Sequence, residues 1–569
     1  MDNKKKLLNL IPLVTAFVAI SSCGAPAEEK YSPYRLNSSG VSNIYNSEAP
    51  TYEDSPIEKK ELNISYQDLF DNYIYQADNI PSKGDNDAKM LIIPIWFNDS
   101  SLFVNEEYKE PIRNDIKNVF FGDEEDTGWR SVSGYYRQES FNKFNLTGSV
   151  TEWYECGKSF EEYCLLDDNT KSQENTSNLV KEAFEWFKNN NSDYASFDSD
   201  KDGYIDSISL IYAAPDYETF SRVNGYRIGN NMWAYSFWKQ DAVKNKNDPI
   251  VNGYLWASYD FMYNKKNPKY TLYGYGDTNH CKVDTHTFIH ETGHLLGLQD
   301  YYDYGTTYGV YGSYSAAGYF SMQDNNVGGH DPYSKIALGW IKPYVVDYNS
   351  FEGDSITLNI RPNQETGDVI LITPEFHDSP FDEYLLIELY TPTGLNKFDT
   401  DYAYLNNALY QGSKESGCRL WHVDARLASP NGKTGTGSNK SYYYSDNPTI
   451  VTDPKTPTTY GKEHATSNTT KDAKTKGYYT EVTGFQSYRL LQLIRQGKNN
   501  TTCGDSFSKK DLFQSGDLFS TRLYTRIFSN RNIFPFAPCL MNNENDFKFA
   551  ISFDSVTAEL ATITISKII

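Results

Sequence analysis

Two histidines spaced one helical turn apart constrain this chain more than any other feature of its sequence. The stretch VDTHTFIHETGHLLGL carries apolar residues at near-helical spacing, and Asp284 or Thr285 could cap the start of a helix. On such a helix His290 and His294 project from the same face. The chain has only 8 histidines in 569 residues. Two imidazoles held in this way can bind Zn²⁺ at about 2.0–2.1 Å.

Three further residues extend the pattern to H-E-x-x-H-x-x-G-x-x-D. Glu291 follows His290 by about 100° of helical turn, which places its carboxylate beside a zinc-activated water as a candidate general base. Gly297 tolerates the positive φ that an abrupt helix end requires. Asp300 then returns as a candidate third ligand. The alternative is an ordinary helix with histidines on its polar face.

The stretch FDSDKDGYIDSIS contains a second candidate metal site. Aspartates at alternate positions followed by a glycine are typical of calcium loops. The twelfth position is Ser209 rather than a bidentate glutamate, so the loop is not a complete EF-hand. The alternative is an acidic turn that binds no ion. We expect a structural Ca²⁺ held by the carboxylates of Asp198, Asp200, Asp202 and Asp206 and by the backbone carbonyl of Tyr204.

The histidine stretch resembles the active-site helix of the immune inhibitor A-like secreted bacterial zinc metallopeptidases, a metzincin-like group in which aspartate replaces the last histidine. The segments SVSGYYRQESFNKFNLTGSVTEWYE, DPYSKIALGWIKP, EYLLIELY and GCRLWHVDARL resemble other parts of that family. The resemblance spans about residues 89–424. It implies protein hydrolysis and one catalytic zinc, with His290, His294 and Asp300 as ligands and Glu291 as general base.

The same resemblance implies a methionine in a tight turn beneath the metal. Met322 in GYFSMQDN is the candidate for this Met-turn, and ordinary core packing is the alternative. In some metzincins a tyrosine two residues after that methionine helps to hold the oxyanion, but Asp324 occupies the position here. Tyr301, Tyr302 and Tyr304 remain candidates for the oxyanion role.

The N-terminus predicts export. A basic start, MDNKKK, precedes the apolar run LLNLIPLVTAFVAI, which is too short and interrupted for a membrane span, and then ISSCG. This pattern predicts a lipoprotein signal peptide over residues 1–22, lipid on Cys23 and a flexible tether over residues 23–60. We expect a lipid-anchored protein on the outer bacterial surface that touches the membrane only through this anchor. An ordinary secretory signal, and a secreted protein, is the alternative.

Charge and cysteine content limit the partners. The formal net charge of −22 argues against nucleic acid, because phosphate backbones need clustered Lys and Arg. The family resemblance implies protein or peptide substrates as the partners. Six cysteines beyond Cys23 permit disulfides in an exported chain, and the pairs Cys156–Cys164 and Cys503–Cys539 are possible.

The pattern of elements predicts an α+β fold. We expect a metzincin-like metallopeptidase domain over residues 61–345, with a twisted mixed sheet and the active-site helix. AKMLIIPIWF and IDSISLIYA are typical of strands buried on both faces. TSNLVKEAFEWFKNN predicts a helix capped by Thr176 or Ser177. A β-rich, sandwich-like region should follow over residues 346–569, with a polar insertion at about 427–480.

Two other histidines have more modest interpretations. His286 could support the metal ligands from the preceding turn of the helix or could be exposed. His422 and Asp424 in WHVD lie on one face of a strand, where a structural hydrogen bond is favoured over a catalytic dyad.

We therefore expect a zinc endopeptidase. A surface adhesin built on a degenerate peptidase scaffold is the alternative, and a zinc amidase acting on cell-wall peptide is a third possibility. The intact H-E-x-x-H favours an enzyme, because a scaffold without catalysis has no chemical need for Glu291.

Overall fold

The computed structural model describes residues 55–62, 64–68, 80–82, 87–165, 169–225, 227–229, 231–239, 241–263, 270, 280–302, 316–429, 433–434, 441–442, 449–450, 463–464, 490–498, 507–525, 527–528, 539–543 and 545–568. The predicted signal peptide, Cys23, Tyr304, Cys503 and most of the predicted insertion lie outside these residues. Within the described part of the chain, no helix combines the length and the apolar character that crossing a bilayer requires.

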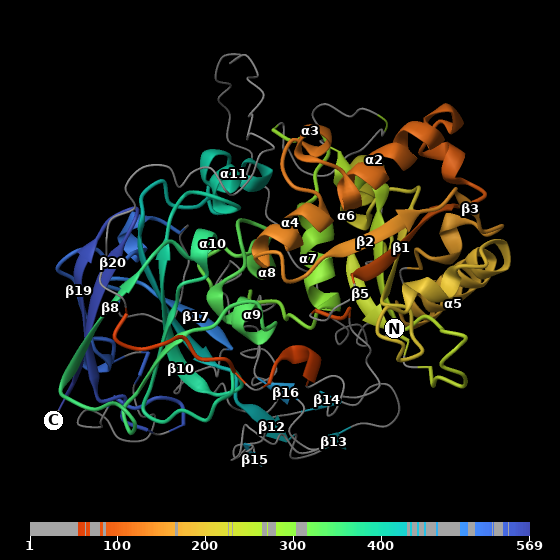
Figure 1. Cartoon of the computed structure of the whole chain (residues 1–569). Helices are drawn as coiled ribbons and strands as arrows, with labels where there is room; N and C mark the ends of the chain where they lie inside the picture. Colours follow the sequence, from red (N-terminus) through yellow and green to blue (C-terminus); the bar gives the residue numbers. More distant parts are fainter. Residues whose placement is uncertain are drawn as a thin grey trace, which may run out of the picture.

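A six-stranded mixed sheet forms the N-terminal half (Figure 1). Its order is β2-β1-β4-β6-β5, with β3 also paired to β1. Strands β1, β2, β3, β4 and β6 run parallel, whereas β5 is an antiparallel edge strand next to β6. The bounds are β1 Ala88–Trp96, β2 Leu146–Val150, β3 Tyr154–Glu155, β4 Ser207–Tyr212, β5 Tyr235–Trp238 and β6 Gly253–Ser258.

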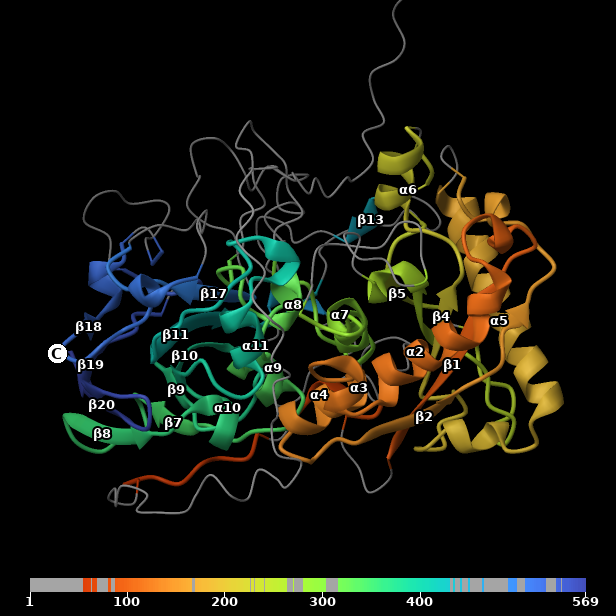
Figure 2. The same ribbon diagram turned by 90° about the horizontal axis from the view of Figure 1, so that it is seen from above.

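Helices cover both faces of this sheet (Figure 2). Met90 and Ile92 of β1 share an apolar core with Ile116 of α2, while Leu91 and Ile93 share another with α5. Both faces of β1 are therefore buried, which explains its unbroken apolar run. The helices are α2 Lys109–Phe121, α3 Glu124–Thr127, α4 Val132–Glu139, α5 Asn169–Asn190, α6 Tyr217–Asn224, α7 His286–Leu295, α8 Met322–Asn325 and α9 Pro332–Ala337, with short 3₁₀ turns η1 Ser100–Leu102, η2 Glu106–Tyr108, η3 Phe160–Glu162, η4 Tyr194–Phe197 and η5 Tyr259–Met262.

The predicted cap of α5 is wrong. The helix begins at Asn169, upstream of Thr176 and Ser177. Thr176 lies inside the helix, where its hydroxyl donates to the Ser172 carbonyl at 3.1 Å. The first turns of α5 are polar, so apolar periodicity could not reveal them.

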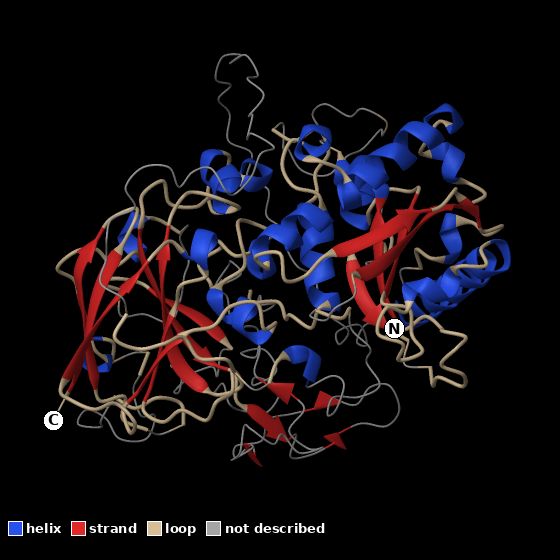
Figure 3. Cartoon of the chain, viewed as in Figure 1, coloured by secondary structure: helices blue, strands red, loops and turns tan. Residues whose placement is uncertain are grey.

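Two sheets dominate the C-terminal half (Figure 3). Their orders are β17-β11-β10-β9-β7 and β18-β19-β20-β8. Ile370 and Leu385 of the first sheet share one apolar core with Ile551 and Ile563 of the second. The strands are β7 Tyr344–Asp347, β8 Ser355–Ile360, β9 Ile370–Thr373, β10 Glu383–Tyr390, β11 Gly417–Asp424, β17 Leu491–Ile494, β18 Leu518–Phe519, β19 Phe549–Val556 and β20 Ala561–Lys567.

Several short elements complete this half. Five two- or three-residue strands lie in or next to the predicted insertion: β12 Leu427–Ser429, β13 Lys433–Thr434, β14 Ser441–Tyr442, β15 Thr449–Ile450 and β16 Glu463–His464. The short helices are α10 Asn363–Thr366 and α11 Asn396–Asp401, with 3₁₀ turns η6 Tyr404–Asn406, η8 Lys509–Asp511 and η9 Thr521–Leu523.

The two halves are joined by a shared interior. Met90 and Phe288 belong to the same buried apolar cluster as Leu371, Leu386 and Trp421. Contacts between the halves are therefore part of the core and not a thin interface.

The N-terminal described segment also packs on the C-terminal half. Lys59 forms an isolated antiparallel β-bridge with Tyr344, and the Lys60 N–H donates to the Pro343 carbonyl at 2.9 Å.

Cys156 and Cys164 are both free thiols in the structure.

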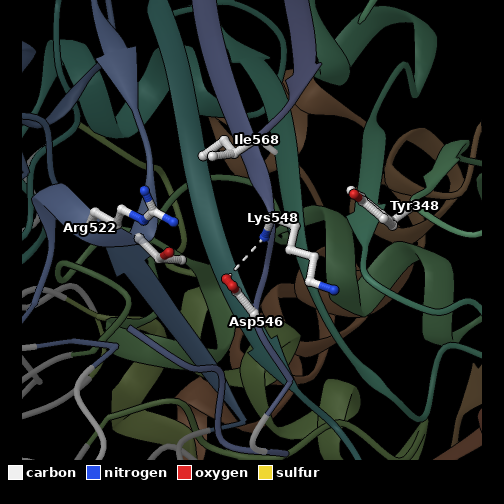
Figure 4. Close-up of a pocket in the computed structure, with 6 residues that line it drawn as sticks. Tyr348, Arg522, Asp546, Lys548 and Ile568 are labelled. Atoms are coloured by element: carbon white, nitrogen blue, oxygen red, sulfur yellow. Dashed lines mark hydrogen bonds between the residues drawn. The ribbon is translucent and has the colours of Figure 1, made fainter. Parts of the chain in front are cut away.

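A cavity of about 250 Å³ opens at one end of the C-terminal sheets (Figure 4). Its walls include positively and negatively charged side chains. The Lys548 backbone N–H donates to Asp546 Oδ1 at 3.3 Å. No lining residue comes from the N-terminal half, so this cavity is separate from the histidine helix. The lining residues are Tyr348, Thr521, Arg522, Asp546, Lys548 and Ile568.

Candidate metal centre

Helix α7 lies at the centre of the molecule, between the sheet of the N-terminal half and the C-terminal sheets (Figures 1 and 2). Thr285 is its N-cap residue but makes no side-chain cap bond. The Asp284 carboxylate instead accepts the His286 N–H at 3.0 Å, which satisfies one of the free donors of the first turn. Asp284, one of the two predicted cap residues, thus provides the side-chain bond.

The end of α7 turns the chain back towards the histidines. Gly297 has φ +102°, a conformation that costs a residue with a Cβ atom but not glycine. The Leu298 N–H then donates to the Gly293 carbonyl at 3.0 Å. This turn brings Asp300 back beside His290 and His294.

His290, His294 and Asp300 converge on one point. Asp300 Oδ1 lies 2.9 Å from His290 Nε2 and 3.3 Å from His294 Nε2. His290 and Asp300 are buried and His294 is partly buried. The three side chains therefore bring their ligand atoms together at one largely buried point.

The outer nitrogen of each ring is held by a backbone carbonyl. His290 Nδ1 lies 2.8 Å from the Met322 carbonyl, and His294 Nδ1 lies 2.9 Å from the Leu298 carbonyl. A carbonyl oxygen only accepts, so each Nδ1 carries a hydrogen. Each Nε2 is thereby directed towards Asp300, the arrangement by which proteins orient imidazoles as metal ligands.

Glu291 completes the cluster. Its carboxylate lies with His290 and His294 in a group whose ligand atoms are all within 4.8 Å of one another. Ser236 of β5 donates to the Glu291 backbone carbonyl at 2.8 Å and lies 3.2 Å from Glu291 Oε2. The residues on α7 could therefore hold a metal ion, and Ser236 orients the glutamate.

Charge and burial shape the protonation of these groups. Burial lowers the pKa of His294, but the Asp300 carboxylate raises it more, to about 9. Burial raises the pKa of Asp300, but the two imidazoles hold it below its ordinary range. Burial raises the pKa of Glu291, and His294 and His290 oppose that rise. Asp300 is thus a carboxylate at neutral pH, and Glu291 is the more basic of the two acids.

Helix α8 packs directly against α7. A Cβ atom on Gly293 would lie 2.2 Å from Gln323 Oε1, so a larger residue at this position would have to displace the Gln323 amide. Gln323 Nε2 donates to the His290 carbonyl at 3.2 Å. Met322 is fully buried and lies below His290, where its carbonyl accepts the Nδ1 hydrogen.

The candidate oxyanion residues differ in position. The Tyr301 hydroxyl is buried and bonds Ser334 Oγ at 2.6 Å, whereas the Tyr302 ring lies 6.5 Å from the His290 ring. Asp324 accepts the Tyr319 N–H at 2.8 Å. The Tyr302 ring therefore lies near His290, whereas the Tyr301 hydroxyl is held by Ser334.

The acidic loop forms a second cluster, ahead of β4. Carboxylate oxygens of Asp198, Asp200 and Asp206 lie within 4.8 Å of one another. Asp202 is outside that group, and its Oδ1 accepts the Tyr204 N–H at 2.7 Å. The Tyr204 hydroxyl donates to the Asp241 carbonyl at 2.7 Å. The structure thus brings together three of the four predicted carboxylates.

The two other histidines considered in the sequence, His286 and His422, have structural partners. His286 is fully buried, so the exposed alternative is wrong. His422 Nε2 lies 2.7 Å from Glu383 Oε1, while Asp424 pairs with Arg426. His422 therefore has a structural hydrogen bond, but its partner is Glu383.

Sequence comparison agrees with this site. Residues 87–328 match the catalytic domain of a peptidase family, so the chain is a hydrolase of the metallopeptidase class. The matching family is described as immune inhibitor A peptidase M6, catalytic domain. Residues 87–328 therefore form an immune inhibitor A-like peptidase catalytic domain, which confirms the resemblance seen in the sequence. A comparison with the curated proteins gave no match.

Proposed function

We propose that this protein is a zinc-dependent endopeptidase that hydrolyses proteins at the bacterial cell surface. The observation that carries the proposal is the convergence of His290 Nε2, His294 Nε2 and Asp300 Oδ1 beside the Glu291 carboxylate. Two imidazoles and one carboxylate are a donor set that suits catalytic zinc, with one position left open for water or substrate.

Asp300 fits the third ligand position better than Glu291 does. Asp300 Oδ1 already bridges the two Nε2 atoms, whereas Ser236 holds Glu291 Oε2 to one side. When bound, Zn²⁺ would supply a Lewis acid that polarises the peptide carbonyl and lowers the pKa of a water molecule to about 7.

Glu291 acts as the general base. Oε2 is oriented by Ser236, and the other oxygen, Oε1, takes the proton of the attacking water and passes it to the leaving amine. Burial raises the pKa of Glu291, which makes its carboxylate a better proton acceptor than an exposed glutamate. Tyr302 is the candidate that helps to hold the oxyanion.

Substitution of Glu291 tests the mechanism. Glu291→Gln keeps the shape of the side chain but cannot accept a proton, so casein or gelatin cleavage should fall by about 10²–10⁴-fold while zinc content stays at that of the parent. Unchanged cleavage would show that Glu291 is not the base. A parent protein that binds zinc but cleaves no protein would favour the adhesin, and cleavage of cell-wall peptide alone would favour the amidase.

Substitution of Asp300 tests the ligand set. Asp300→Ala should lower zinc affinity and activity together, because one of three protein ligands is lost. Zinc content equal to that of the parent after dialysis against a weak chelator would remove Asp300 from the site.

A lipid anchor on Cys23 accounts for the proposed location. The support is the basic and apolar N-terminal pattern that ends in ISSCG. In a bacterial host, Cys23→Ser should move the protein from the membrane fraction to the medium, and retention in the membrane would contradict the anchor.

We also propose a structural Ca²⁺ in the acidic loop. Burial and the neighbouring Asp200 carboxylate raise the pKa of Asp206 to about 7, so gathering Asp198, Asp200 and Asp206 as carboxylates is unfavourable without a cation. Calcium would offset that repulsion and bind Asp198, Asp200 and Asp206.

Calcium removal tests this site. A ligand present at 100 times its Kd stabilises the folded state by about 2.7 kcal/mol, so a selective calcium chelator should lower the Tm. Asp200→Ala should have a lower Tm in calcium and no further response to chelator. A parent Tm that ignores the chelator would exclude the site.

A further inference from the structure

A buried imidazole connects the start of α7 to the C-terminal half. His286 is fully buried and stacks on Trp129 with ring centroids 4.3 Å apart and an interplanar angle of 15°. Its Nδ1 lies 2.7 Å from Asp284 Oδ1, and its Nε2 lies 3.1 Å from Asp399 Oδ1. We call Asp284, His286 and Asp399 the His286 bridge.

The His286 bridge is an ion pair with two acids. A carboxylate only accepts, so both ring nitrogens donate and the ring is an imidazolium. Burial lowers the pKa of His286, but Asp399 and Asp284 raise it more, to about 10. Removing one partner of such a buried pair is costly, because the remaining charge loses its compensation.

Asp399 comes from outside the region that matches the peptidase family. It lies on α11, Asn396–Asp401, whereas the match covers residues 87–328. Its second oxygen, Oδ2, accepts the Gly328 N–H at 2.7 Å. Asn396 of the same helix accepts the Gly329 N–H at 3.0 Å.

Helix α11 therefore holds two segments that meet at the metal centre. One is the first turn of α7, one turn before His290. The other is the Gly328–Gly329 segment, which follows α8 after two residues. The Met322 carbonyl orients His290, so the position of α7 relative to α8 decides where His290 Nε2 points. A ten-residue helix such as α7 depends on tertiary packing for its placement.

We infer that Asp399 is a positioning residue for the metal centre, acting through His286 and Gly328 on the orientation of His290. The inference rests on the proposed zinc site. The C-terminal half then contributes to the geometry of the metal centre, because the matched catalytic region alone lacks α11.

The test compares variants of α11 in the full-length protein. Asp399→Ala removes both accepted bonds, and Asp399→Asn keeps an acceptor oxygen but loses the charge. Asp401→Asn is the matched control, because Asp401 lies on the same helix in an exposed pair with Lys397. Zinc affinity is measured by competition with a chromogenic chelator, the visible spectrum is recorded with Co²⁺, and kcat and KM are measured on one peptide.

For Asp399→Ala we expect zinc affinity to fall by about 10-fold, the lower end of the effect of removing groups that orient metal ligands. The Co²⁺ spectrum should shift and kcat should fall, with KM within about twofold of the parent value. Asp399→Asn should lie between Asp399→Ala and the parent, and Asp401→Asn should match the parent.

A purely structural role would give a different result. If the Asp399 variants lose Tm but keep the zinc affinity and the Co²⁺ spectrum of the parent, the inference is wrong. If Asp399→Ala does not fold, Asp399→Asn decides by the same two measurements. If the parent binds zinc but cleaves no peptide, the proposed function fails, and the affinity comparison still decides the role of Asp399.

Discussion

At the scale of single residues, Ser236 contacts Glu291, the proposed general base, and no sequence motif points to it. It lies on the antiparallel edge strand β5 and contacts both the backbone carbonyl and the carboxylate of Glu291. A hydrogen bond to a charged group contributes about 1.5–3 kcal/mol. Its loss should leave the Glu291 carboxylate in more than one orientation.

Ser236→Ala should therefore lower kcat by about 10-fold with little change in KM. Ser236→Thr retains a hydroxyl and should restore part of that loss. Ser149→Ala, an exposed serine on β2 at the other edge of the sheet, serves as the control. An unchanged kcat for Ser236→Ala would show that Glu291 is oriented without it.

The difference between His290 and Ser236 shows what the sequence could predict about the site. His290, Glu291, His294, Gly297 and Asp300 lie within one helix and its turn, where spacing alone decides which side chains share a face. Ser236 reaches the site through sheet pairing and packing. Nothing in its local sequence, YSFW, marks that contact.

At the scale of elements, the buried side chain of His330, which precedes α9, should make the free energy of unfolding depend on pH. It is fully buried, and within the described part of the chain neither ring nitrogen has a hydrogen-bond partner. Burial and the nearby Lys335 lower its pKa well below 6.5. The ring is therefore neutral in the folded protein and can take a proton only after unfolding.

The sign of this effect follows from linkage. Because the pKa of His330 is depressed in the folded protein, this residue costs no stability above pH 6.5. Below pH 6.5 it lowers the free energy of unfolding by up to about 1.4 kcal/mol per pH unit. Asp206 and Asp331, whose pKa values burial raises to about 7 and about 6, act in the opposite direction. Only a comparison of variants isolates His330.

Denaturant unfolding at pH 7.5, 6.5 and 5.5 is the measurement. The parent should lose more stability than His330→Gln between pH 6.5 and pH 5.5, whatever the difference between the two proteins at pH 7.5. Parallel curves would mean that His330 is protonated in the folded protein.

Elements differed in how well the sequence predicted them. Strand β1 was predicted nearly to its ends because burial on both faces leaves an unbroken apolar run. Helix α11 was not predicted, since its six residues, NKFDTD, carry no apolar periodicity. Its position is decided by tertiary bonds such as that of Asp399 to Gly328, which a local pattern cannot encode.

At the scale of the whole molecule, a buried ion pair joins three elements of the two halves. Lys335 Nζ of α9 lies 3.0 Å from Glu139 Oε1 of α4 and donates to Asn363 Oδ1 of α10 at 2.6 Å. Both charged side chains are almost fully buried. The pair thus links the N-terminal and C-terminal halves next to their shared apolar core.

Glu139→Gln should destabilise the protein by about 3–5 kcal/mol, because it leaves the Lys335 ammonium buried and unpaired. The double variant Glu139→Gln/Lys335→Met should recover much of that loss. Denaturant unfolding followed by fluorescence measures both, and the exposed Lys397–Asp401 pair is the control at about 0–1 kcal/mol. A double variant no more stable than Glu139→Gln would contradict this account.

The close approach of α8 to α7 has a consequence for protein engineering. Gly293 lies between the two histidines, and the space that its Cβ would fill belongs to Gln323. The middle of the H-E-x-x-H helix is thus constrained by a side chain thirty positions further along the chain. A larger residue at position 293 would displace the Gln323 amide and its bond to the His290 carbonyl, so a directed-evolution library that diversifies this helix should vary position 323 at the same time.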